Sequence, residues 1–327
     1  MPDITLPLLL KAVLPVFLLM GVGALLRKLR VLTPEGDHTV LALAVSVTYP
    51  CLIIGNIVGN TSLRDPANVW LPMLCGAAFM IAGGALSWLA APLFKLRDGP
   101  VRRTFALSCS IQNYGYLPIP ILHAIFPDNR WMGVLFLYTL GIELLLWTIG
   151  VWFMNPRTHG AARNILNPVV LSIILGLTLN LFPWPEWAAE NQPASWLLSG
   201  IQQTVHLLGE CAVPLGLIVV GATLFDLVSK PGWHADAGAA IGGVIMRLGV
   251  LPATMLGTLF LLPTASADFR HIIAVQAAMP AAVFPMIIAR RYGGDEATAM
   301  RVIVMTTLLS LLTIPFAVKL ALQWVGG

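Results

Sequence analysis

The chain has 327 residues, of which 57% are hydrophobic and only 10% are charged, and its formal net charge is +4. Soluble globular proteins carry about 45–50% apolar and about 25% charged residues, so these few charged side chains are too sparse to cover a soluble surface. The composition therefore argues against a soluble enzyme, a disordered chain and a nucleic-acid-binding protein, and it predicts a polytopic membrane protein.

Ten apolar runs are long enough to cross the hydrocarbon core of a bilayer as helices, because such a helix needs about 20 residues. These runs, numbered as spans one to ten, cover residues 4–26, 38–60, 68–94, 103–126, 131–154, 164–182, 197–225, 236–262, 270–290 and 298–324. Transmembrane β-strands do not fit, since the runs are too long and show no two-residue alternation. The sequence thus predicts an all-α polytopic membrane protein with ten transmembrane helices.

Lysine and arginine residues concentrate in the loops on one side of these spans. The opposite loops contain three: Arg64, Arg130 and Arg270. Because positively charged loops stay in the cytoplasm, both chain termini are expected on the outer side of the membrane. The loops that follow the odd-numbered spans contain thirteen: Arg27, Lys28, Arg30, Lys95, Arg97, Arg102, Arg103, Arg157, Arg163, Lys230, Arg290, Arg291 and Arg301.

The spans divide into two halves of five, residues 1–154 and 164–327, joined by a short cytoplasmic linker at 155–163. Because five is an odd number, the second half must enter the membrane in the opposite orientation to the first. An offset of 164 residues relates Gln112 in span four to Gln276 in span nine. The pattern predicts an inverted repeat, an architecture found in many secondary transporters.

Spans four and nine each contain two closely spaced prolines, Pro118 and Pro120 in span four and Pro280 and Pro285 in span nine. Proline removes a backbone donor and clashes with the preceding turn, so both helices are expected to break near the middle of the bilayer. Broken helices at corresponding positions of two halves are the best sequence indication of a transporter's substrate site. The alternative is a pair of proline-kinked helices that only pack.

Amide and phenol side chains lie beside these breaks. Such groups need polar partners at bilayer depth, and irregular backbone there must be buried in protein or line a cavity. The backbone N–H groups freed at the start of a half-helix suit a carboxylate. The candidate substrate-binding residues are therefore Gln112, Asn113, Tyr114 and Tyr116 in span four and Gln276 in span nine.

Four ionisable side chains also lie deep within spans, where a charge costs about 2.5–3.5 kcal/mol on insertion scales. They are Glu143 in span five, His206 and Glu210 one helical turn apart in span seven, and Arg247 in span eight. In one hypothesis Glu143 or Glu210 carries a coupling proton, and Arg247 attracts an anion or keeps the carboxylate charged. In the other, a static Glu–Arg pair braces the bundle, or a neutral glutamate bonds across helices. Of the two acids we favour Glu143 for coupling.

Several segments resemble the auxin efflux carrier family. Residues 112–120, Gln-Asn-Tyr-Gly-Tyr-Leu-Pro-Ile-Pro, are similar to the fourth span of that family, and residues 209–224 are similar to its seventh. Residues 291–295 and 307–315 resemble its ninth-to-tenth-span region, and the sequence Asn-Pro-Val-Val that begins at Asn167 resembles the start of its sixth. The similarity extends over nearly the whole chain. The family is grouped with bile-acid-type sodium symporters in the bile/arsenite/riboflavin transporter superfamily.

The resemblance implies a secondary carrier of a small organic anion, with the substrate at the crossover of broken helices four and nine and Asn113 at the family's crossover asparagine position. It also implies a scaffold of helices 1, 2, 6 and 7, a transport domain of helices 3–5 and 8–10, and a homodimer. The short linker is typical of a bacterial member in the inner (plasma) membrane. Ala277 and Ala278 stand where plant members tend to have an asparagine, which argues against auxin itself as the substrate.

No motif indicates catalysis, a cofactor or a metal site, since the sequence contains neither G-x-x-x-x-G-K-[ST] nor H-E-x-x-H and no C-x-x-C spacing. We expect a transporter, not an enzyme, whose partners are lipid, a small carboxylate and a coupling proton. Sodium ranks behind the proton because amides and tyrosines, not several acids or hydroxyls, surround the breaks. Two alternatives stay open: a sodium- or proton-coupled symporter or antiporter of the bile-acid type, and a transporter-derived membrane sensor.

Overall fold

The computed structural model describes residues 5–97, 99–126, 128–155, 166–182, 192–229, 237–263 and 265–326. Within these ranges the regular structure is helical, and the one β-type contact is an isolated bridge between Gln112 and Ala281. The structure therefore confirms the predicted all-α class. Except for Asn155, the predicted linker at 155–163 lies outside the described residues, as do the cytoplasmic cations Arg157, Arg163 and Lys230.

The helices follow one another along the chain with short connections. The first half contains α1 (Leu6–Lys28), α2 (Pro34–Leu43), η1 (Ala44–Thr48), α3 (Tyr49–Ile57), η2 (Thr61–Arg64), α4 (Ala67–Ala90), η3 (Ala91–Phe94), α5 (Gly99–Ser110), α6 (Pro118–Ile125), α7 (Arg130–Leu145), η4 (Leu146–Gly150) and α8 (Val151–Met154). The second contains α9 (Pro168–Asn180), α11 (Gln192–Glu210), α12 (Ala212–Ser229), α13 (Ala237–Ile245), η6 (Met246–Val250), α14 (Leu251–Thr258), η7 (Leu259–Leu261), α15 (Ala267–Ala277), α16 (Phe284–Tyr292) and α17 (Glu296–Gly326). The elements η1, η4 and η6 are π-helical turns.

Helix occupies each of the ten predicted spans, but not always as one membrane-length helix. Seven continuous runs in the described ranges are long and apolar enough to cross a membrane. Helix α9 has only 13 residues, and spans four and nine are each divided into two short helices. Span seven is longer than predicted, because Ser195–Ser229 form a run of 35 residues with a turn at Cys211. Ten complete crossings therefore stay a prediction.

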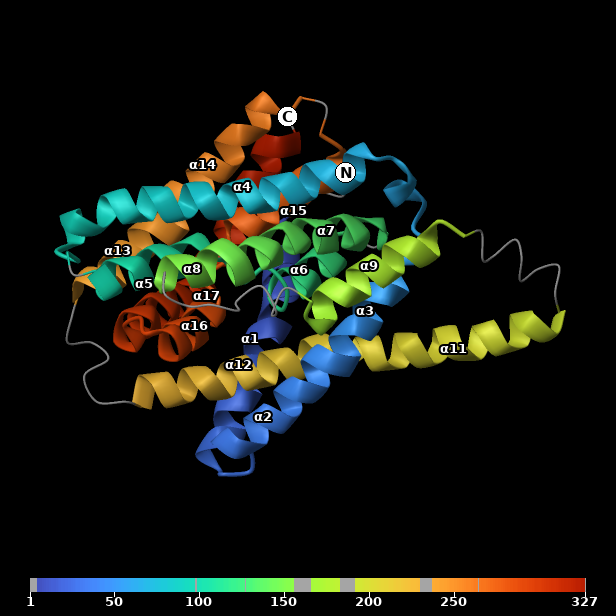
Figure 1. The fold of residues 1–327 in the computed structure, drawn as a ribbon, viewed down its shortest axis with the longest axis horizontal. Coiled ribbons are helices and arrows are strands. Elements are labelled where there is room, and N and C mark those ends of the chain that lie inside the picture. Colours follow the sequence, from blue (N-terminus) through green and yellow to red (C-terminus); the bar gives the residue numbers. More distant parts are fainter. Residues whose placement is uncertain are drawn as a thin grey trace.

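The helices pack in two sets (Figure 1). In one set α1 lies along α12, and α3 packs against α9 and α11. In the other α4 lies along α7 and α5, while α17 packs against α13 and α15. Figure 1 shows α11 and α12 running end to end in the lower part of the view, with α2 below them, and α4 along the upper part. The broken helices α5–α6 and α15–α16 lie within the second set.

Glycines bring the backbones of the closest helix pairs into contact. A Cβ atom built on Gly23 of α1 would lie 1.9 Å from the carbonyl oxygen of Ile218 in α12, and one on Gly221 of α12 would lie 1.9 Å from that of Met20. The same reciprocal arrangement joins α4 to α7, where a Cβ on Gly141 would lie 1.9 Å from the carbonyl oxygen of Met73. Small residues at helix contacts are the usual way to gain packing energy in a bilayer, where lipid is as apolar as a leucine side chain.

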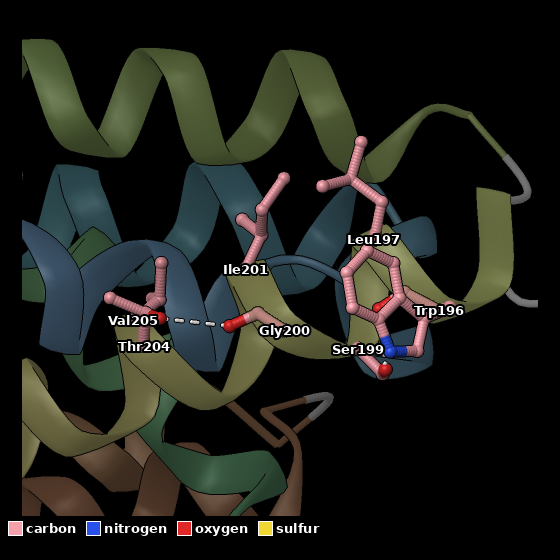
Figure 2. A pocket seen from close by; sticks show the side chains of 7 residues that line it. All are labelled: Trp196, Leu197, Ser199, Gly200, Ile201, Thr204 and Val205. Carbon is pink, nitrogen blue, oxygen red and sulfur yellow. Dashed lines mark hydrogen bonds between the residues drawn. The ribbon is translucent and has the colours of Figure 1, made fainter. Parts of the chain in front are cut away.

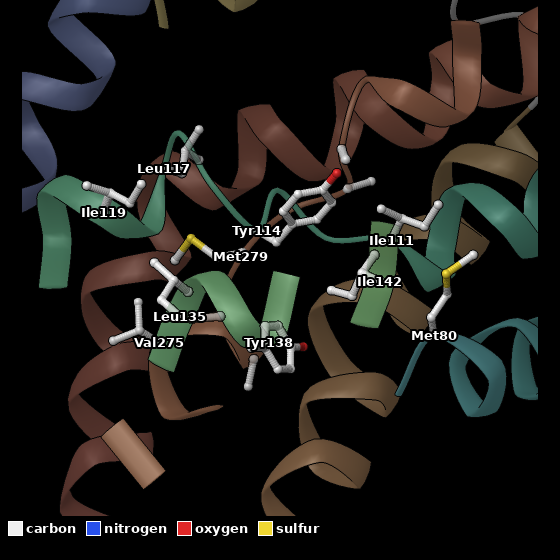
Figure 3. Packing of buried hydrophobic residues seen from close by; sticks show 14 of the residues in the cluster. Met80, Ile111, Tyr114, Leu117, Ile119, Leu135, Tyr138, Ile142, Val275 and Met279 are labelled. Carbon is white, nitrogen blue, oxygen red and sulfur yellow. The ribbon is translucent and has the colours of Figure 1, made fainter. Parts of the chain in front are cut away.

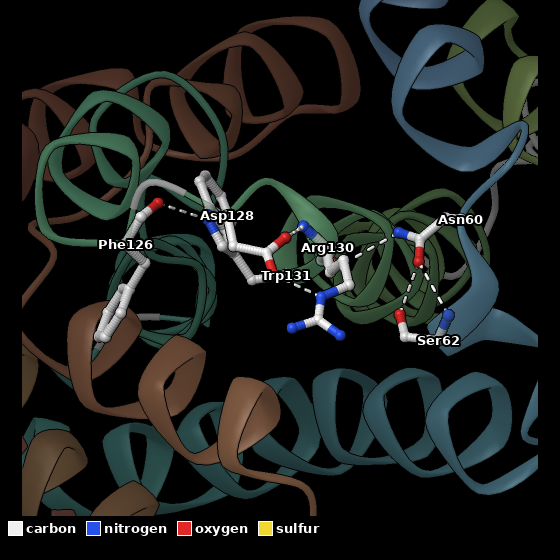
Figure 4. Close-up of polar contacts among 6 residues, drawn as sticks. All are labelled: Asn60, Ser62, Phe126, Asp128, Arg130 and Trp131. Carbon is white, nitrogen blue, oxygen red and sulfur yellow. Dashed lines mark hydrogen bonds and ion pairs between the residues drawn. The ribbon is translucent and has the colours of Figure 1, made fainter. Parts of the chain in front are cut away.

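Polar side chains fasten the helix ends around Asn60, at the end of α3 (Figure 4). Its amide donates to the carbonyl oxygen of Arg130 at the start of α7 (2.9 Å) and accepts from the Ser62 hydroxyl (2.6 Å). Asn180, the last residue of α9, donates to the Asn60 carbonyl oxygen (3.1 Å). Asn60 therefore fixes where three helices meet.

In the loop before α7, a hydrogen bond from the Arg130 backbone N–H lowers the pKa of the exposed Asp128 carboxyl.

A buried arginine fastens the other end of the first set. Arg27, in the last turn of α1, contacts the carboxylate of Asp37 in α2 and lies 3.1 Å from that of Asp226 in α12. It also donates to the carbonyl oxygen of Leu32 (2.7 Å). Two carboxylates and a carbonyl thus compensate one buried guanidinium, as a buried charge requires.

The glycine contact between α1 and α12 generates a stability prediction. Gly23→Ala should lower the thermal unfolding midpoint of the purified protein, because the added methyl group meets backbone that cannot move unless the helices separate, at a cost of about 1–3 kcal/mol. Gly21→Ala is the matched control, since nothing lies within 4 Å of a Cβ built there. Equal midpoints for the two variants would contradict this account of the contact.

Candidate functional site

Two unwound segments cross in the interior and pair with each other. One joins the end of α5 at Ser110 to the start of α6 at Pro118, and the other joins the end of α15 at Ala277 to the start of α16 at Phe284. The N–H of Asn113 donates to the carbonyl oxygen of Pro280 (2.8 Å), and the N–H of Ala282 donates to that of Ile111 (2.9 Å). These bonds form the antiparallel bridge between Gln112 and Ala281. The structure therefore contains the breaks and the crossing that the sequence predicts.

The prolines cause the breaks in a more specific way than a kink. Pro118 is the first residue of α6 and Pro285 the second of α16, where proline fits because no N–H is needed. In a continuous helix the residue at 118 would donate to the carbonyl oxygen of Tyr114, and proline cannot. The side-chain amide of Gln276, in α15, donates to this oxygen instead (2.9 Å). Gln276 thus replaces a helix bond that Pro118 removes.

The amides of the predicted site are buried and partly engaged. Gln112 is 2% exposed and its amide donates to the Tyr138 hydroxyl in α7 (2.5 Å). The Asn113 side-chain oxygen accepts from the N–H of Leu117, just before α6 (3.3 Å). This bond uses only the oxygen, so among the described residues the Nδ2 group of Asn113, a side chain that is 8% exposed, is left as a donor beside the start of α6. Apolar side chains surround this region (Figure 3).

Glu143, in α7, is bound by three donors and is 5% exposed. Its Oε1 atom accepts from the Tyr114 hydroxyl (2.5 Å), and its Oε2 atom accepts from the Trp147 indole (2.8 Å) and the Asn167 amide (3.4 Å). Asn167 also caps the start of α9, because its Oδ1 atom accepts from the N–H of Val170 (3.0 Å). Glu143 therefore connects the crossing segment to the start of α9.

Tyr116 points from the crossing segment toward the first set of helices. Its ring centroid lies 5.6 Å from that of Tyr49, the first residue of α3. Gly216 of α12 makes room for the ring, because a Cβ atom there would lie 2.1 Å from Tyr116 Cε1. Tyr114 instead stacks parallel to Phe284 of α16, with centroids 6.5 Å apart. The four predicted residues in span four therefore face different neighbours.

Glu143 and Arg247 do not form the ion pair that one sequence hypothesis allowed. Arg247 lies in η6 and is 1% exposed. Its Nη2 atom contacts the carbonyl oxygen of Ala277 at the end of α15 (3.5 Å) and the Met255 sulfur (3.7 Å). A static pair between Glu143 and Arg247 is therefore absent from the described part of the chain.

The second predicted acid lies elsewhere. Glu210 contacts His206 (3.3 Å between Oε1 and Nε2), as their four-residue spacing predicts. Both side chains are more than 60% exposed on α11. The structure thus places this pair on an outer surface of the bundle and away from the crossing segments.

Sequence reasoning singled out neither Tyr138 nor Trp147 nor the contact that Asn167 makes. Trp147 follows Glu143 by four residues, so helical spacing was an available signal. The contacts of Tyr138 and Asn167 join residues 26 and 24 positions apart across helix packing, and no local pattern predicts them.

The fold and this crossing define a class: a multi-pass helical membrane protein with two broken helices paired through their unwound segments. A family model described as "Membrane transport protein" (Mem_trans) matches residues 8–163 and 160–318, and the chain belongs to this family. This match confirms the resemblance to auxin efflux carriers and identifies the chain as a membrane transport protein.

Two curated relatives come from Arabidopsis thaliana. Protein PIN-LIKES 6 is 20% identical over an alignment of 380 positions, gaps included, which covers 88% of each chain. Protein PIN-LIKES 7 is 21% identical over an alignment of 327 positions, gaps included, which covers 77% of this chain and 80% of the relative. The similarity to both is low, but it extends over most of the chain.

Proposed function

We propose that this transporter carries a small organic anion, an auxin-like acid or another mono- or dicarboxylate, by alternating access, with the substrate bound at the crossing segments. Asn113 carries this proposal, because its side chain is only 8% exposed and its hydrogen bond to Leu117 uses the oxygen, which leaves Nδ2 available to a ligand. It lies beside the start of α6, where a helix presents partial positive charge. A carboxylate would satisfy both features.

The packing supports a moving domain and a fixed one. If α9 corresponds to α1 and the α11–α12 run to the α2–α3 run, the α1–α12 pair corresponds to the α9–α3 pair. In the same way α4–α7 corresponds to α13–α17. This correspondence supports a five-plus-five inverted repeat, with helices 1, 2, 6 and 7 as scaffold and helices 3–5 and 8–10 as transport domain. The positive loops support an inner-membrane location with both termini outside.

Glu143 is the residue that best fits proton coupling. It is buried without a basic partner among the described residues, while Tyr114 ties it to the crossing segment. Asn167 ties the same carboxylate to α9, in the proposed scaffold. Protonation of Glu143 would remove the negative charge and turn one of its two accepting oxygens into a donor, at the boundary between the two proposed domains. The bond from Asn167 would then weaken, which favours their relative movement.

The outer face of α11 supports a homodimer. Its exposed side chains include the His206–Glu210 pair within the 35-residue apolar run, and a charge facing lipid at that depth is costly. Small residues hollow the same helix at Gly200 and Thr204, beside the exposed Trp196 (Figure 2). Such hollows let helices approach closely in membranes, and a second copy would shield the polar pair.

Asn113→Ala tests the substrate site. Uptake of radiolabelled benzoate and malonate into proteoliposomes should weaken, with an apparent affinity lower by about tenfold to hundredfold, because a hydrogen bond to a charged group is lost. Asn56→Ala is the control, since that amide bonds only to the carbonyl oxygen of Leu52 in its own helix. Unchanged uptake in Asn113→Ala would remove the crossing segments as the site.

Glu143→Gln tests coupling. The variant should transport at a rate that no longer responds to an imposed pH gradient, because glutamine cannot take up the proton. Glu210→Gln should keep the response, since the structure places Glu210 on the exposed face of α11. A response that persists in Glu143→Gln would exclude coupling through this residue, and a parallel series with a sodium gradient distinguishes the sodium-coupled alternative.

Gly200→Trp tests the dimer. The bulky side chain would fill the hollow on α11, and native mass spectrometry should then show monomers where the unmodified protein gives dimers. Leu74→Trp is the control, because Leu74 is an exposed residue of α4 in the proposed transport domain. A dimer that persists in Gly200→Trp, or an unmodified protein that is monomeric, would refute this interface.

A further inference from the structure

Arg247 is a buried cation, 1% exposed, whose contacts with the rest of the described chain compensate its charge only weakly. It lies in the middle of span eight within the π-helical turn η6, and π-helical turns occur frequently at functional sites. A guanidinium offers five N–H donors. Its contacts here are a carbonyl oxygen at 3.5 Å and a sulfur at 3.7 Å, and both are weak hydrogen bonds by distance.

Arg27 shows how the same chain compensates a buried guanidinium elsewhere. That side chain has two carboxylates and a carbonyl oxygen around it. Arg247 has no carboxylate within ion-pair distance in the part of the chain that the structure describes. The Nε atoms of both arginines are buried without a hydrogen-bond partner there, but that of Arg27 lies 3.1 Å from the Asp226 carboxylate. Glu143 carries the converse arrangement, with three donors and no cation. The two opposite charges are kept apart rather than paired.

The position of Arg247 joins it to the crossing segments. Its contact with Ala277 places the guanidinium at the end of α15, where the unwound segment begins. Gln276, the residue before Ala277 in α15, also has an unpaired polar atom: its buried Oε1 lacks a hydrogen-bond partner among the described residues. Gln276 of α15 thus has an unpaired acceptor, and Arg247, which contacts the next residue of that helix, has an unpaired donor.

We propose that Arg247 binds the carboxylate of the transported anion, with Nε and one Nη atom as a bidentate pair. The proposal rests on the proposed function and adds the group that neutralises the substrate's charge. Guanidinium matches carboxylate geometry through two parallel N–H bonds, and the orphan Nε–H is one of the two donors that such a pair uses. The orphan acceptor of Gln276 would then favour a substrate with a hydrogen-bond donor near its carboxylate.

A purely structural role makes a different prediction. If Arg247 only compensates the carbonyl end of α15, its loss lowers thermal stability but leaves the choice between ligands unchanged. The discriminating quantity is therefore the ratio of affinities for a carboxylate and for its neutral amide.

The experiment measures binding of two matched pairs, phenylacetate with phenylacetamide and malonate with malonamide, by calorimetry of the full chain in lipid nanodiscs. In Arg247→Met the affinity for the carboxylates should fall by about tenfold to hundredfold, the range for a hydrogen bond to a charged group. The affinity for the amides should change by less than about twofold. Arg247→Lys keeps the charge but lacks the fork, so its loss should be intermediate. Arg27→Met, which removes a buried guanidinium already paired with acids, should leave the carboxylate-to-amide ratio unchanged.

The outcomes separate the two proposals. An unmodified protein that does not prefer the carboxylates would refute the proposed substrate class and this inference together. A preference that persists in Arg247→Met would refute the inference alone, because the crossing segments would then bind the anion without Arg247.

A measurement on the unmodified chain covers the case in which the variants do not fold. Photolabelling with 4-azidobenzoate, mapped by mass spectrometry, should give adducts within residues 237–261 or 267–277. Benzoate should prevent these adducts and benzamide should not. Adducts confined to other helices would refute the assignment of Arg247.

Discussion

The structure depends on the pairing of two unwound segments inside the bilayer. Backbone N–H and C=O groups that lack partners in hydrocarbon each cost several kcal/mol, so neither helix could break alone. The bonds from Asn113 to Pro280 and from Ala282 to Ile111 satisfy each segment with the other. Thr306 of α17 supports the second segment by accepting from the N–H of Ala281 (3.2 Å). Helices of both sets pack around this crossing, since α7 and α17 contact α15 while α1 contacts α6.

This pairing explains why the sequence predicts part of the site and not the rest. Apolar runs about as long as a bilayer is thick indicate where the helices lie, and close pairs of prolines indicate which two helices break. The partners of the broken segments are a different matter. The Gln276 side chain donates a hydrogen bond to the carbonyl oxygen of Tyr114, which is 162 positions away in the sequence. Local sequence patterns carry no information about such a contact. Unwinding at 111–117, before the prolines, depends on that distant partner.

The direction in which each ionisable side chain points within the helix bundle was also hard to predict. Sequence places Glu143, Glu210 and Arg247 at similar depths in their spans, but depth does not say which way a side chain points. The structure turns Glu143 toward Tyr114 and Arg247 toward the end of α15, and it leaves Glu210 on an outer face. Helix packing decides these directions. The four-residue spacings of Glu143 with Trp147 and of His206 with Glu210 are the part that local geometry determines.

Asn167 has a consequence for which sequences this architecture tolerates. Its oxygen caps α9 and its nitrogen donates to Glu143, so one side chain performs an acceptor and a donor task at two separate atoms. Aspartate would cap the helix as well but would place a second carboxylate against the first. Serine would have one atom, on a shorter side chain, for both tasks. We therefore expect few amino acids other than asparagine to be tolerated at position 167, although this residue lies outside the crossing segments.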